Sequence, residues 1–259
     1  MITLNYSRLN VWDICPRLYR FQYIDRIPTP PKPALFLANQ VHQALQQYLS
    51  IPLAEREGIN LEQLLRDNWR RHPERPRVFA DREEEAEHGR RALSMLQNFL
   101  AGDDARAEPE AVEQWFEVDV TEGVRLNGKV DRIDRTAGGL VVVDYKTGRL
   151  WNREAEMEGL QPVTYTFLVQ EATGEPVREV VLFFLPANER LVIRPDPGVL
   201  SEFRERLAAY ARTIQAEREF APAPSPFCSI CDHRDRCPEG QAFTAEAASA
   251  RDEAPELPF

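Results

Sequence analysis

The sequence predicts an α/β protein in which a mixed central β-sheet is flanked by helices. Two strand-like segments joined by a glycine-containing turn, residues 125–134 and 140–145, form an antiparallel hairpin in the middle of the chain. Helical and strand-like segments then alternate, which is the pattern of a sheet with helices packed against it. With 259 residues and 43% hydrophobic side chains, the chain is long enough to bury a sizeable core.

The part of the chain before the sheet is predicted to be helical. Ser7 is a suitable N-cap for a first helix, and Cys15-Pro16 interrupts that helix before a second, aromatic-rich run at residues 17–24. Residues 35–101 form a mainly helical region. One of its helices contains His42, and an isolated histidine on a packed helix is more often a core residue than a metal ligand.

The other elements surround the hairpin. Strands are expected at residues 111–120, 177–185 and 191–194, and helices starting near Pro162 and spanning 200–219. Glu113 and Glu117 lie on the first of these strands; either could face the site, but we expect them on the exposed face of the strand. We assign residues 1–240 to one domain, with the sheet-containing core at residues 111–220. The acidic residues 241–259 are expected to form a flexible tail.

The hairpin brings two acidic residues and a lysine together. If its turn is centred between Ala137 and Gly138, the numbers of opposite residues add up to 275, which places Asp131 opposite Asp144. Because side chains alternate along a strand, Lys146 shares the face of Asp144. Two carboxylates and one amine therefore converge.

This arrangement predicts a divalent metal site. Like charges that face each other on a hairpin are destabilising, so a cation is expected between the carboxylates. Mg²⁺ prefers oxygen ligands and completes its shell with water or substrate phosphate, and a neighbouring ammonium orients water or neutralises developing charge. Phosphodiester hydrolysis needs these features. The alternative at this point is a surface hairpin with a solvated charged face.

Charge and hydropathy narrow the class of protein. The net charge of −10 argues against a protein that coats nucleic acid non-specifically, although a local basic groove is compatible with it. No apolar run approaches the roughly 18 residues of a membrane span, and the N-terminus lacks the basic and apolar regions of a signal peptide. We therefore expect a cytoplasmic protein that does not act at a membrane.

The four cysteines predict a metal centre. Three of them follow the spacing C-x₂-C-x₅-C at Cys228, Cys231 and Cys237, and Cys15 lies far upstream. In a cytoplasmic protein this clustering favours metal ligands over disulfides. Zinc and an iron–sulfur cluster both accept four thiolates, and zinc with His233 in place of one cysteine is a further alternative. Any of these centres would join the two ends of the domain as a metal-cluster staple.

In their order along the chain, these motifs resemble the RecB-type nucleases of the PD-(D/E)XK superfamily. The resemblance is to the iron–sulfur branch that includes the AddB nuclease domain and the CRISPR adaptation exonucleases, and it extends from about residue 6 to residue 237. The motifs are S-x-L-x₅-C-P from Ser7, the helical His42, G-x-x-D-R-I-D from Gly128, D-Y-K-T-G from Asp144, Q-x₃-Y from Gln161, and the cysteine cluster. The ordered set is far more specific than any single motif.

The resemblance implies a restriction-endonuclease-like fold and a role for each motif. Asp131, Asp144, His42 and the carbonyl of Tyr145 would bind Mg²⁺ or Mn²⁺. Lys146 would position the attacking water, and Gln161 and Tyr165 would support the site and contact the DNA. The four ligands of a [4Fe-4S] cluster would be Cys15, Cys228, Cys231 and Cys237. One departure is Ala38, where the family commonly has glycine four residues before the histidine.

The function expected from this resemblance is divalent-metal-dependent hydrolysis of DNA. We predict an exonuclease that acts on single-stranded DNA or DNA ends in repair, recombination or foreign-DNA processing. The alternative is a non-catalytic DNA-binding or scaffold subunit of a helicase–nuclease complex, in which a helicase would be the partner. Hydrolysis of RNA is a third hypothesis, because the chemistry at phosphorus is the same.

Overall fold

The computed structural model describes residues 1–196 and 198–252. Within this range the chain forms two compact units. The sheet unit comprises Met1–Leu4 and Pro31–Ala209, and the cysteine unit comprises Asn5–Pro30 and the chain from Tyr210 onward. No helix in the described range is long and apolar enough to cross a membrane.

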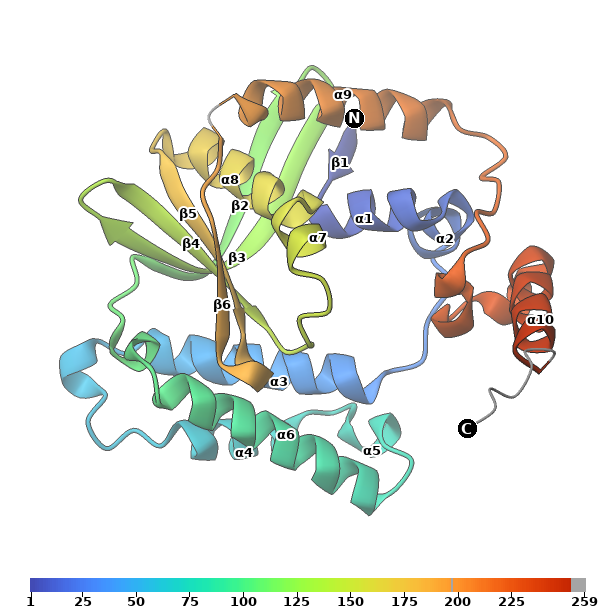
Figure 1. Cartoon of the computed structure of the whole chain (residues 1–259). Helices are drawn as coiled ribbons and strands as arrows, with labels where there is room; N and C mark the ends of the chain where they lie inside the picture. The colour runs from blue at the N-terminus through green and yellow to red at the C-terminus, as the bar shows by residue number, and fades with distance from the viewer. Residues whose placement is uncertain (197, 253–259) are drawn as a thin grey trace, which may run out of the picture. The chain divides into compact units, whose positions relative to one another are not determined.

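A six-stranded mixed sheet is the centre of the sheet unit (Figure 1). The strand order is β1-β3-β4-β5-β6, and β2 also pairs with β3. The strands are β1 (Ile2–Leu4), β2 (Ala111–Thr121), β3 (Val124–Thr136), β4 (Gly139–Lys146), β5 (Val177–Phe184) and β6 (Glu189–Ile193). Pairs β1–β3 and β4–β5 are parallel and the other pairs are antiparallel. The prediction of an α/β fold with a mixed central sheet is confirmed.

Helices cover both faces of this sheet (Figure 1). The sheet unit contains the helices α3 (Pro33–Leu49), α4 (Leu61–Arg71), α5 (Arg75–Val78), α6 (Arg82–Leu100), α7 (Arg153–Met157) and α8 (Leu160–Thr173), and α9 (Val199–Ala216) begins in it. Alternation along β4 supplies both interfaces. Val143 and Tyr145 pack into the core formed with α3, α4 and α6, whereas Leu140 and Val142 pack with Tyr165 of α8.

The long helix α6 shows how the sequence specifies these elements. Asp81 is its N-cap, and the carboxylate accepts hydrogen bonds from the N–H groups of Glu83 and Glu84. Three glutamates in the first turn complement the helix dipole. The core-facing side chains of α6 are Ala92, Met95, Leu96 and Phe99. Their helical spacing places this side of α6 in the core, and the charged remainder stays exposed.

The hairpin between β3 and β4 has the register expected from its turn. Arg132 lies opposite Val143, and the pairing continues to Thr136 opposite Gly139. All of these pairs add up to 275, so the same register places Asp131 opposite Asp144. The predicted convergence of the two carboxylates is therefore present in the backbone.

The cysteine unit combines the N-terminal helices with the C-terminal loops. It contains α1 (Tyr6–Ile14), α2 (Pro16–Tyr19), the π-helix η1 (Arg20–Ile24), the 3₁₀-helices η5 (Pro226–Ile230) and η6 (Arg234–Arg236), and α10 (Pro238–Asp252). The two chain segments meet through Asp13, whose carboxylate accepts from the Tyr210 hydroxyl at 2.5 Å, and through Arg17, which donates to the Phe220 carbonyl at 2.9 Å. The aromatic ring of Trp12 also packs edge-on against Phe220.

Three local expectations differ from the structure. The N-cap of the first helix is Asn5, not Ser7, because the Asn5 side chain reaches the N–H of Arg8. Strand β1 has no counterpart among the expected elements, since three residues are too few to show a period. The expected tail at 241–259 is helical as far as Asp252, because its alanine-rich sequence favours helix; residues 253–259 lie outside the described range.

Candidate active site and metal centres

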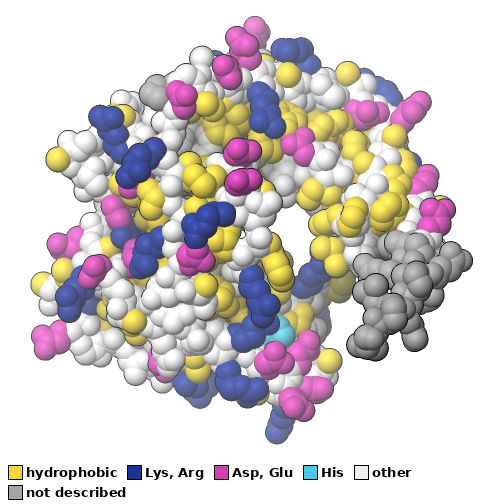
Figure 2. Space-filling model, viewed as in Figure 1, with side chains coloured by type: hydrophobic (Ala, Val, Ile, Leu, Met, Phe, Trp, Pro, Cys, Tyr) yellow, Lys and Arg dark blue, Asp and Glu magenta, His cyan; other side chains and the backbone are white. Residues whose placement is uncertain are grey.

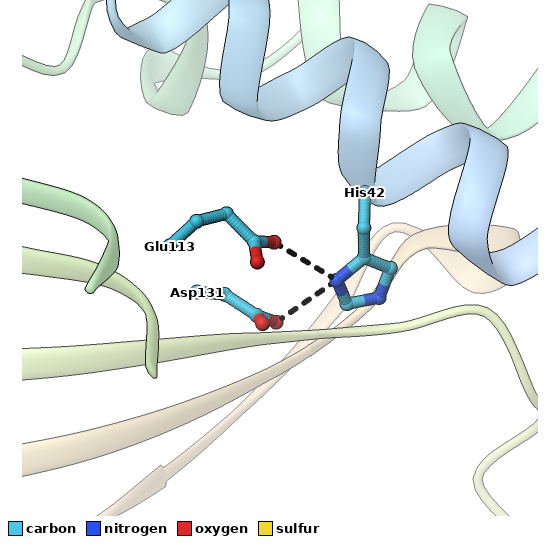
Figure 3. A group of neighbouring side chains, drawn as sticks. All are labelled: His42, Glu113 and Asp131. Carbon is cyan, nitrogen blue, oxygen red and sulfur yellow. Dashed lines mark ion pairs between the residues drawn. The ribbon is translucent and has the colours of Figure 1, made fainter. Parts of the chain in front are cut away.

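Three side chains from separate elements of the sheet unit meet beside β3. His42 of α3, Glu113 of β2 and Asp131 of β3 point toward one another (Figure 3). Nδ1 of His42 lies 3.3 Å from Oδ2 of Asp131 and 3.7 Å from Oε1 of Glu113. One ligand atom from each residue lies within 4.8 Å of the others. Two carboxylates and an imidazole at this spacing are suited to a divalent cation such as Mn²⁺ or Mg²⁺.

Glu113 reaches this cluster because the backbone of β2 turns locally. Its φ angle is +52°, in the left-handed region where residues other than glycine are uncommon. The register with β3 is the same on both sides, with Val112 opposite Arg132 and Gln114 opposite Val130, so Glu113 lies opposite Asp131. The side chain of Glu113 is only 5% exposed. The prediction of an exposed position for Glu113 is therefore wrong.

Glu117, the other glutamate expected on an exposed strand face, does lie there. Its side chain is 41% exposed and pairs with Arg125 at 3.0 Å. The two glutamates are four residues apart on one strand, but only Glu113 follows the unusual backbone angle. Local backbone conformation therefore separates a candidate ligand from a surface residue.

Asp131 is fixed by the backbone of the neighbouring strand. Its Oδ2 accepts a hydrogen bond from the Tyr145 N–H at 2.8 Å. The residue is 7% exposed. Because Tyr145 immediately follows Asp144, this bond joins Asp131 to the segment that carries the other predicted site residues. A carboxylate held in this way has its orientation set before any ion binds.

The protonation of His42 reflects the three carboxylates near it. Burial alone would lower its pKa, but Asp131, Glu113 and Asp144 outweigh that effect and raise the pKa to about 10. Without a metal, a proton on the imidazole therefore neutralises part of the negative charge at neutral pH. A divalent cation bound to the same nitrogen would replace this proton.

A second group of predicted residues surrounds Asp144. The ammonium of Lys146 lies 2.9 Å from Asp144 Oδ2 and also contacts Gln161 Oε1. Gln161 donates to Asp144 Oδ1 at 2.9 Å and to the Tyr165 hydroxyl at 3.2 Å. Gln161 and Tyr165 are one helical turn apart on α8, as their spacing predicts. The carboxamide thus connects the carboxylate, the amine and the phenol.

The cluster of His42, Glu113 and Asp131 interacts electrostatically with the group around Asp144. Burial raises the pKa of Asp144, Lys146 opposes this shift, and the charge of Asp131 adds to it, with His42 acting in the opposite direction. Asp144 is 4% exposed. The structure therefore brings together His42 with the aspartates, the lysine, and the glutamine and tyrosine that the sequence singled out, namely Asp131, Asp144, Lys146, Gln161 and Tyr165.

The donor atoms fit a hard divalent cation. Oδ2 of Asp144 is fully buried, and its interaction is with the Lys146 ammonium at 2.9 Å. Oε2 of Glu113 is likewise buried and pairs with Lys129. Buried carboxylate oxygens with spare acceptor capacity are costly unless a cation is near. The residues present therefore match the expected metal.

The four cysteines line one cavity of the cysteine unit. None of the four forms a disulfide. A backbone N–H points at each sulfur: Ala223 donates to Cys15 and Ser225 to Cys228, both at 3.4 Å, His233 donates to Cys231, and Gly240 donates to Cys237. Burial raises the pKa of Cys231 and Cys237, and the N–H bonds oppose this shift because they favour the thiolate. A shared cavity with four thiols and four donors is suited to a bound metal centre.

The surroundings of the four sulfurs bear on which centre they hold. Tetrahedral zinc, with Zn–S bonds of about 2.3 Å, needs sulfurs about 3.8 Å apart. Among the described residues, which include all four cysteines, no three sulfurs lie within 4.8 Å of one another. Gly240 lies directly behind two of them, and a Cβ there would be 3.5 Å from the sulfur of Cys237 and 3.6 Å from that of Cys228.

His233, the alternative ligand considered from the sequence, is buried in the same unit. It lines the cysteine cavity and is 2% exposed. Its ring packs against Phe21 with 5.4 Å between ring centres. All four cysteines line the cavity together with this histidine, so the histidine is not needed to complete a set of four ligands.

Comparisons with known proteins agree with this description of the fold. Residues 3–238 match the family model described as the PD-(D/E)XK nuclease superfamily. A crystal structure named “Putative exonuclease” from Eubacterium rectale has a TM-score of 0.55 at 15% identity, covering 89% of this chain and 87% of that chain. The crystal structure of SSO0001 has a TM-score of 0.40 at 16% identity, covering 91% and 85%. No curated protein matches.

Proposed function

Because the chain belongs to the PD-(D/E)XK nuclease superfamily, we propose that it is a divalent-metal-dependent deoxyribonuclease acting as an exonuclease on single-stranded DNA or DNA ends. The observation that carries this proposal is the convergence of His42 and Asp131 with the contacting pair Asp144 and Lys146. Such a set combines metal ligands with an amine, which phosphodiester hydrolysis requires.

The residues that would hold the cation are His42, Asp131 and Asp144, together with the carbonyl of Tyr145. We add Glu113 to this set because its carboxylate faces the same imidazole. A bound Mg²⁺ or Mn²⁺ supplies Lewis-acid polarisation of the scissile phosphate. The chain itself supplies fixed negative oxygens, so little reorganisation is needed when the ion enters.

Lys146 is the residue that we assign to the attacking water. Its ammonium is held between Asp144 and Gln161, so it is a hydrogen-bond donor fixed beside the carboxylates. From this position it orients a water toward phosphorus and stabilises negative charge that develops on the phosphate oxygens. In our proposal, Gln161 and Tyr165 hold the side chains of Asp144 and Lys146 in place and face the DNA strand.

An exposed tryptophan beside the cluster supports a single-stranded substrate. Trp115 lies opposite Lys129, two pairs along the strands from Glu113 and Asp131. Gly128 faces Leu168 of α8, so its strand neighbour Lys129 points to the opposite side, toward Glu113. Trp115 is 55% exposed. An exposed indole next to an amine is suited to stacking an unpaired base while the amine contacts phosphate.

For the cysteine cavity we propose a [4Fe-4S] cluster, which would place the protein in the iron–sulfur branch of RecB-like nucleases. The cavity shared by all four cysteines and the N–H donors to their sulfurs support a metal centre there, and the resemblance of the motifs favours the cluster over zinc. The role of this centre is structural, because it joins Cys15 to a cysteine-rich loop near the other end of the chain. We place the activity in the cytoplasm, in DNA repair, recombination or foreign-DNA processing, with a helicase as a candidate partner.

Digestion of labelled oligonucleotides tests the proposed function. Purified protein is incubated with single-stranded DNA, duplex DNA and RNA of one sequence, each labelled at either end, with Mg²⁺ or Mn²⁺. We expect release of short products from single-stranded DNA and none from the variant Asp144→Asn. If the wild type binds DNA but cleaves it with neither metal, the result would instead support the non-catalytic scaffold. If it digests the RNA oligonucleotide faster than the DNA, the result would support a ribonuclease.

A further inference from the structure

The helical part of the sheet unit contains a groove that the active site does not use. It lies among α4, α5 and α6 and has a volume of about 530 Å³. Its floor is largely apolar, with Leu65, Trp69, Ala86, Gly89 and Leu93. Its charged lining residues are Arg66, Arg70, Arg75, Arg82, Arg90 and Glu85. Five guanidinium groups and one carboxylate give this groove a formal charge of +4.

The positive charge comes from folding, not from local composition. Residues 61–93 contain eight arginines and eight acidic residues, so the segment as a whole is neutral. Helix geometry collects five of the arginines on one surface because the groove residues of α6 recur at positions 82, 85, 86, 89, 90 and 93. Figure 2 shows basic and acidic side chains interspersed over one face of the molecule.

Internal ion pairs leave most of this charge available. Glu85 pairs with Arg75 at 2.5 Å and accepts a hydrogen bond from the Trp69 indole at 2.9 Å. Arg66 reaches Glu62 only at 3.8 Å. In the described part of the chain, neither Arg70 nor Arg90 has an ion-pair partner, and both are exposed. A chain with a net charge of −10 thus presents a groove with an excess of guanidinium groups, two of which, Arg70 and Arg90, have no ion-pair partner in the described range.

The floor of the groove is open to close approach. Gly89 lies in the middle of α6, and a Cβ added there would meet nothing within 4 Å. A larger side chain at this position would project into the groove. Glycine inside a helix costs about 1 kcal/mol relative to alanine, and no packing contact of this glycine offsets that cost. The open floor and the arginine rims together form a channel with space for an extended polyanion.

We propose that this arginine groove binds the phosphate backbone of a nucleic-acid strand outside the active site. The inference rests on the proposed nuclease function, and it extends that function to the part of the substrate that is not cleaved. Guanidinium groups match phosphate oxygens in a bidentate geometry, and several of them in a row match a repeating phosphate chain better than isolated carboxylates. A local positive channel on an acidic protein also guides a polyanion to one place.

The groove and the active site are separated by one helix. Trp69, on the groove floor, packs edge-on against Phe36 of α3 with 4.9 Å between ring centres. His42 follows Phe36 by six residues, which is about 9 Å along the helix. A strand in the groove therefore continues for some length before it reaches the metal ligands. Only substrates longer than a few nucleotides should depend on the groove.

Paired substitutions test this inference. Arg70→Gln/Arg90→Gln removes two groove charges, and the matched control Arg77→Gln/Arg91→Gln removes two charges from exposed positions of α5 and α6 outside the groove. Binding of a 30-nucleotide single strand is measured by fluorescence anisotropy without divalent metal over a range of salt concentrations. We expect the groove variant to bind about tenfold more weakly and to lower the salt slope by about 1.4, the value for two phosphate contacts on a single strand.

A second readout separates this inference from the proposed function. Both paired variants should cleave a small chromogenic thymidine phosphodiester at the wild-type rate, whereas only the groove variant should show a higher KM for the long strand. Arg70→Lys/Arg90→Lys should restore the salt slope. Equal DNA binding by the groove and control variants would overturn the inference even if cleavage is intact.

The remaining outcomes are also decisive. If groove-dependent binding occurs with poly-glutamate but not with DNA, the surface binds an acidic protein and the nucleic-acid assignment is wrong. If the wild type cleaves neither substrate, the proposed nuclease function fails, and the anisotropy data still decide whether the groove binds a strand.

Discussion

At the residue scale, Glu113 contributes most to the difference between the expected and observed site. A non-glycine residue at φ +52° stores roughly 1–2 kcal/mol of backbone strain. That strain persists because Glu113 faces His42 and Lys129. Strain kept at a cluster of ligand-type residues is a reason to assign Glu113 to the metal, since a surface strand residue would relax to an ordinary conformation.

The substitution Glu113→Gln tests this assignment. Loss of one negative oxygen should raise the Mn²⁺ concentration needed for half-maximal cleavage about tenfold and weaken Mn²⁺ binding in calorimetry by a similar factor. The matched control is Glu117→Gln on the exposed part of the same strand. Identical Mn²⁺ titrations for wild type and Glu113→Gln would remove Glu113 from the ligand set.

His42 predicts a pH dependence of metal binding. Its pKa is about 10 without metal, so at neutral pH the imidazole carries a proton that a cation must displace. Each bound ion should then release one proton, and affinity should increase about tenfold per pH unit until pH approaches 10, where the dependence ends. Calorimetry of Mn²⁺ binding in buffers of different ionisation enthalpy counts this proton. In His42→Ala the release should disappear; if it stays the same, His42 is not a ligand.

The sequence located some site residues better than others for a physical reason. The turn at Ala137 and Gly138 is tight, so counting from it gives the correct register and brings Asp131 opposite Asp144. On β2, just before the turn that leads to β3, an irregularity between Asp119 and Thr121 shifts the register by one residue. Counting from that turn therefore fails to place Glu113 opposite Asp131. A bulge is specified by the fold around it, and periodicity does not reveal it.

At the element scale, the helices from residue 61 to residue 93 were predictable as helices but not as a charged surface. Each has an amphipathic pattern, so its buried side follows from the sequence. The relative rotation of α4 and α6 decides which arginines face each other, and that rotation depends on packing of α3 against both helices. The net charge of residues 61–93 is zero, so a count of charges along the sequence does not reveal the positive groove.

Gly89 in the middle of helix α6 leads to a prediction about the stability of the protein. Gly89 has a helical conformation and open space around its Cα, so Gly89→Ala should stabilise the protein by up to about 1 kcal/mol. A methyl group is too small to fill the groove, so binding of the long strand should stay at the wild-type level. Chemical denaturation and anisotropy measure the two effects. A lower stability for Gly89→Ala would mean that the position is not an ordinary helical site.

At the scale of the whole molecule, the chain's two ends are joined in one unit. Cys15 and Cys228 are 213 residues apart, yet they line one cavity. The cysteine spacing alone predicted a metal centre but left zinc and iron–sulfur open, because both accept the same ligands. The distance between sulfurs depends on how the N-terminal helix meets the C-terminal loop. Only a three-dimensional arrangement supplies that distance.

Removal of one cysteine tests the metal-cluster staple. A cross-link that closes a loop of 213 residues removes on the order of several kcal/mol of unfolded-state entropy in the simple chain model. Because such a protein is stabilised by only about 5–15 kcal/mol in total, Cys15→Ser should lower the melting temperature and expose both ends of the chain to protease. The matched wild type, purified without oxygen, should be brown and lose its broad visible absorption on oxidation.

The active site gives this prediction an internal control. His42, Asp131, Asp144 and Lys146 belong to the sheet unit, and the cysteines belong to the other unit. The folded fraction of Cys15→Ser should therefore cleave the small thymidine phosphodiester at the wild-type rate per molecule. A colourless wild type with stoichiometric zinc would overturn the iron assignment. An unchanged melting temperature in Cys15→Ser would mean that packing of the Trp12 and Phe220 rings, and not a metal, holds the two ends of the chain together.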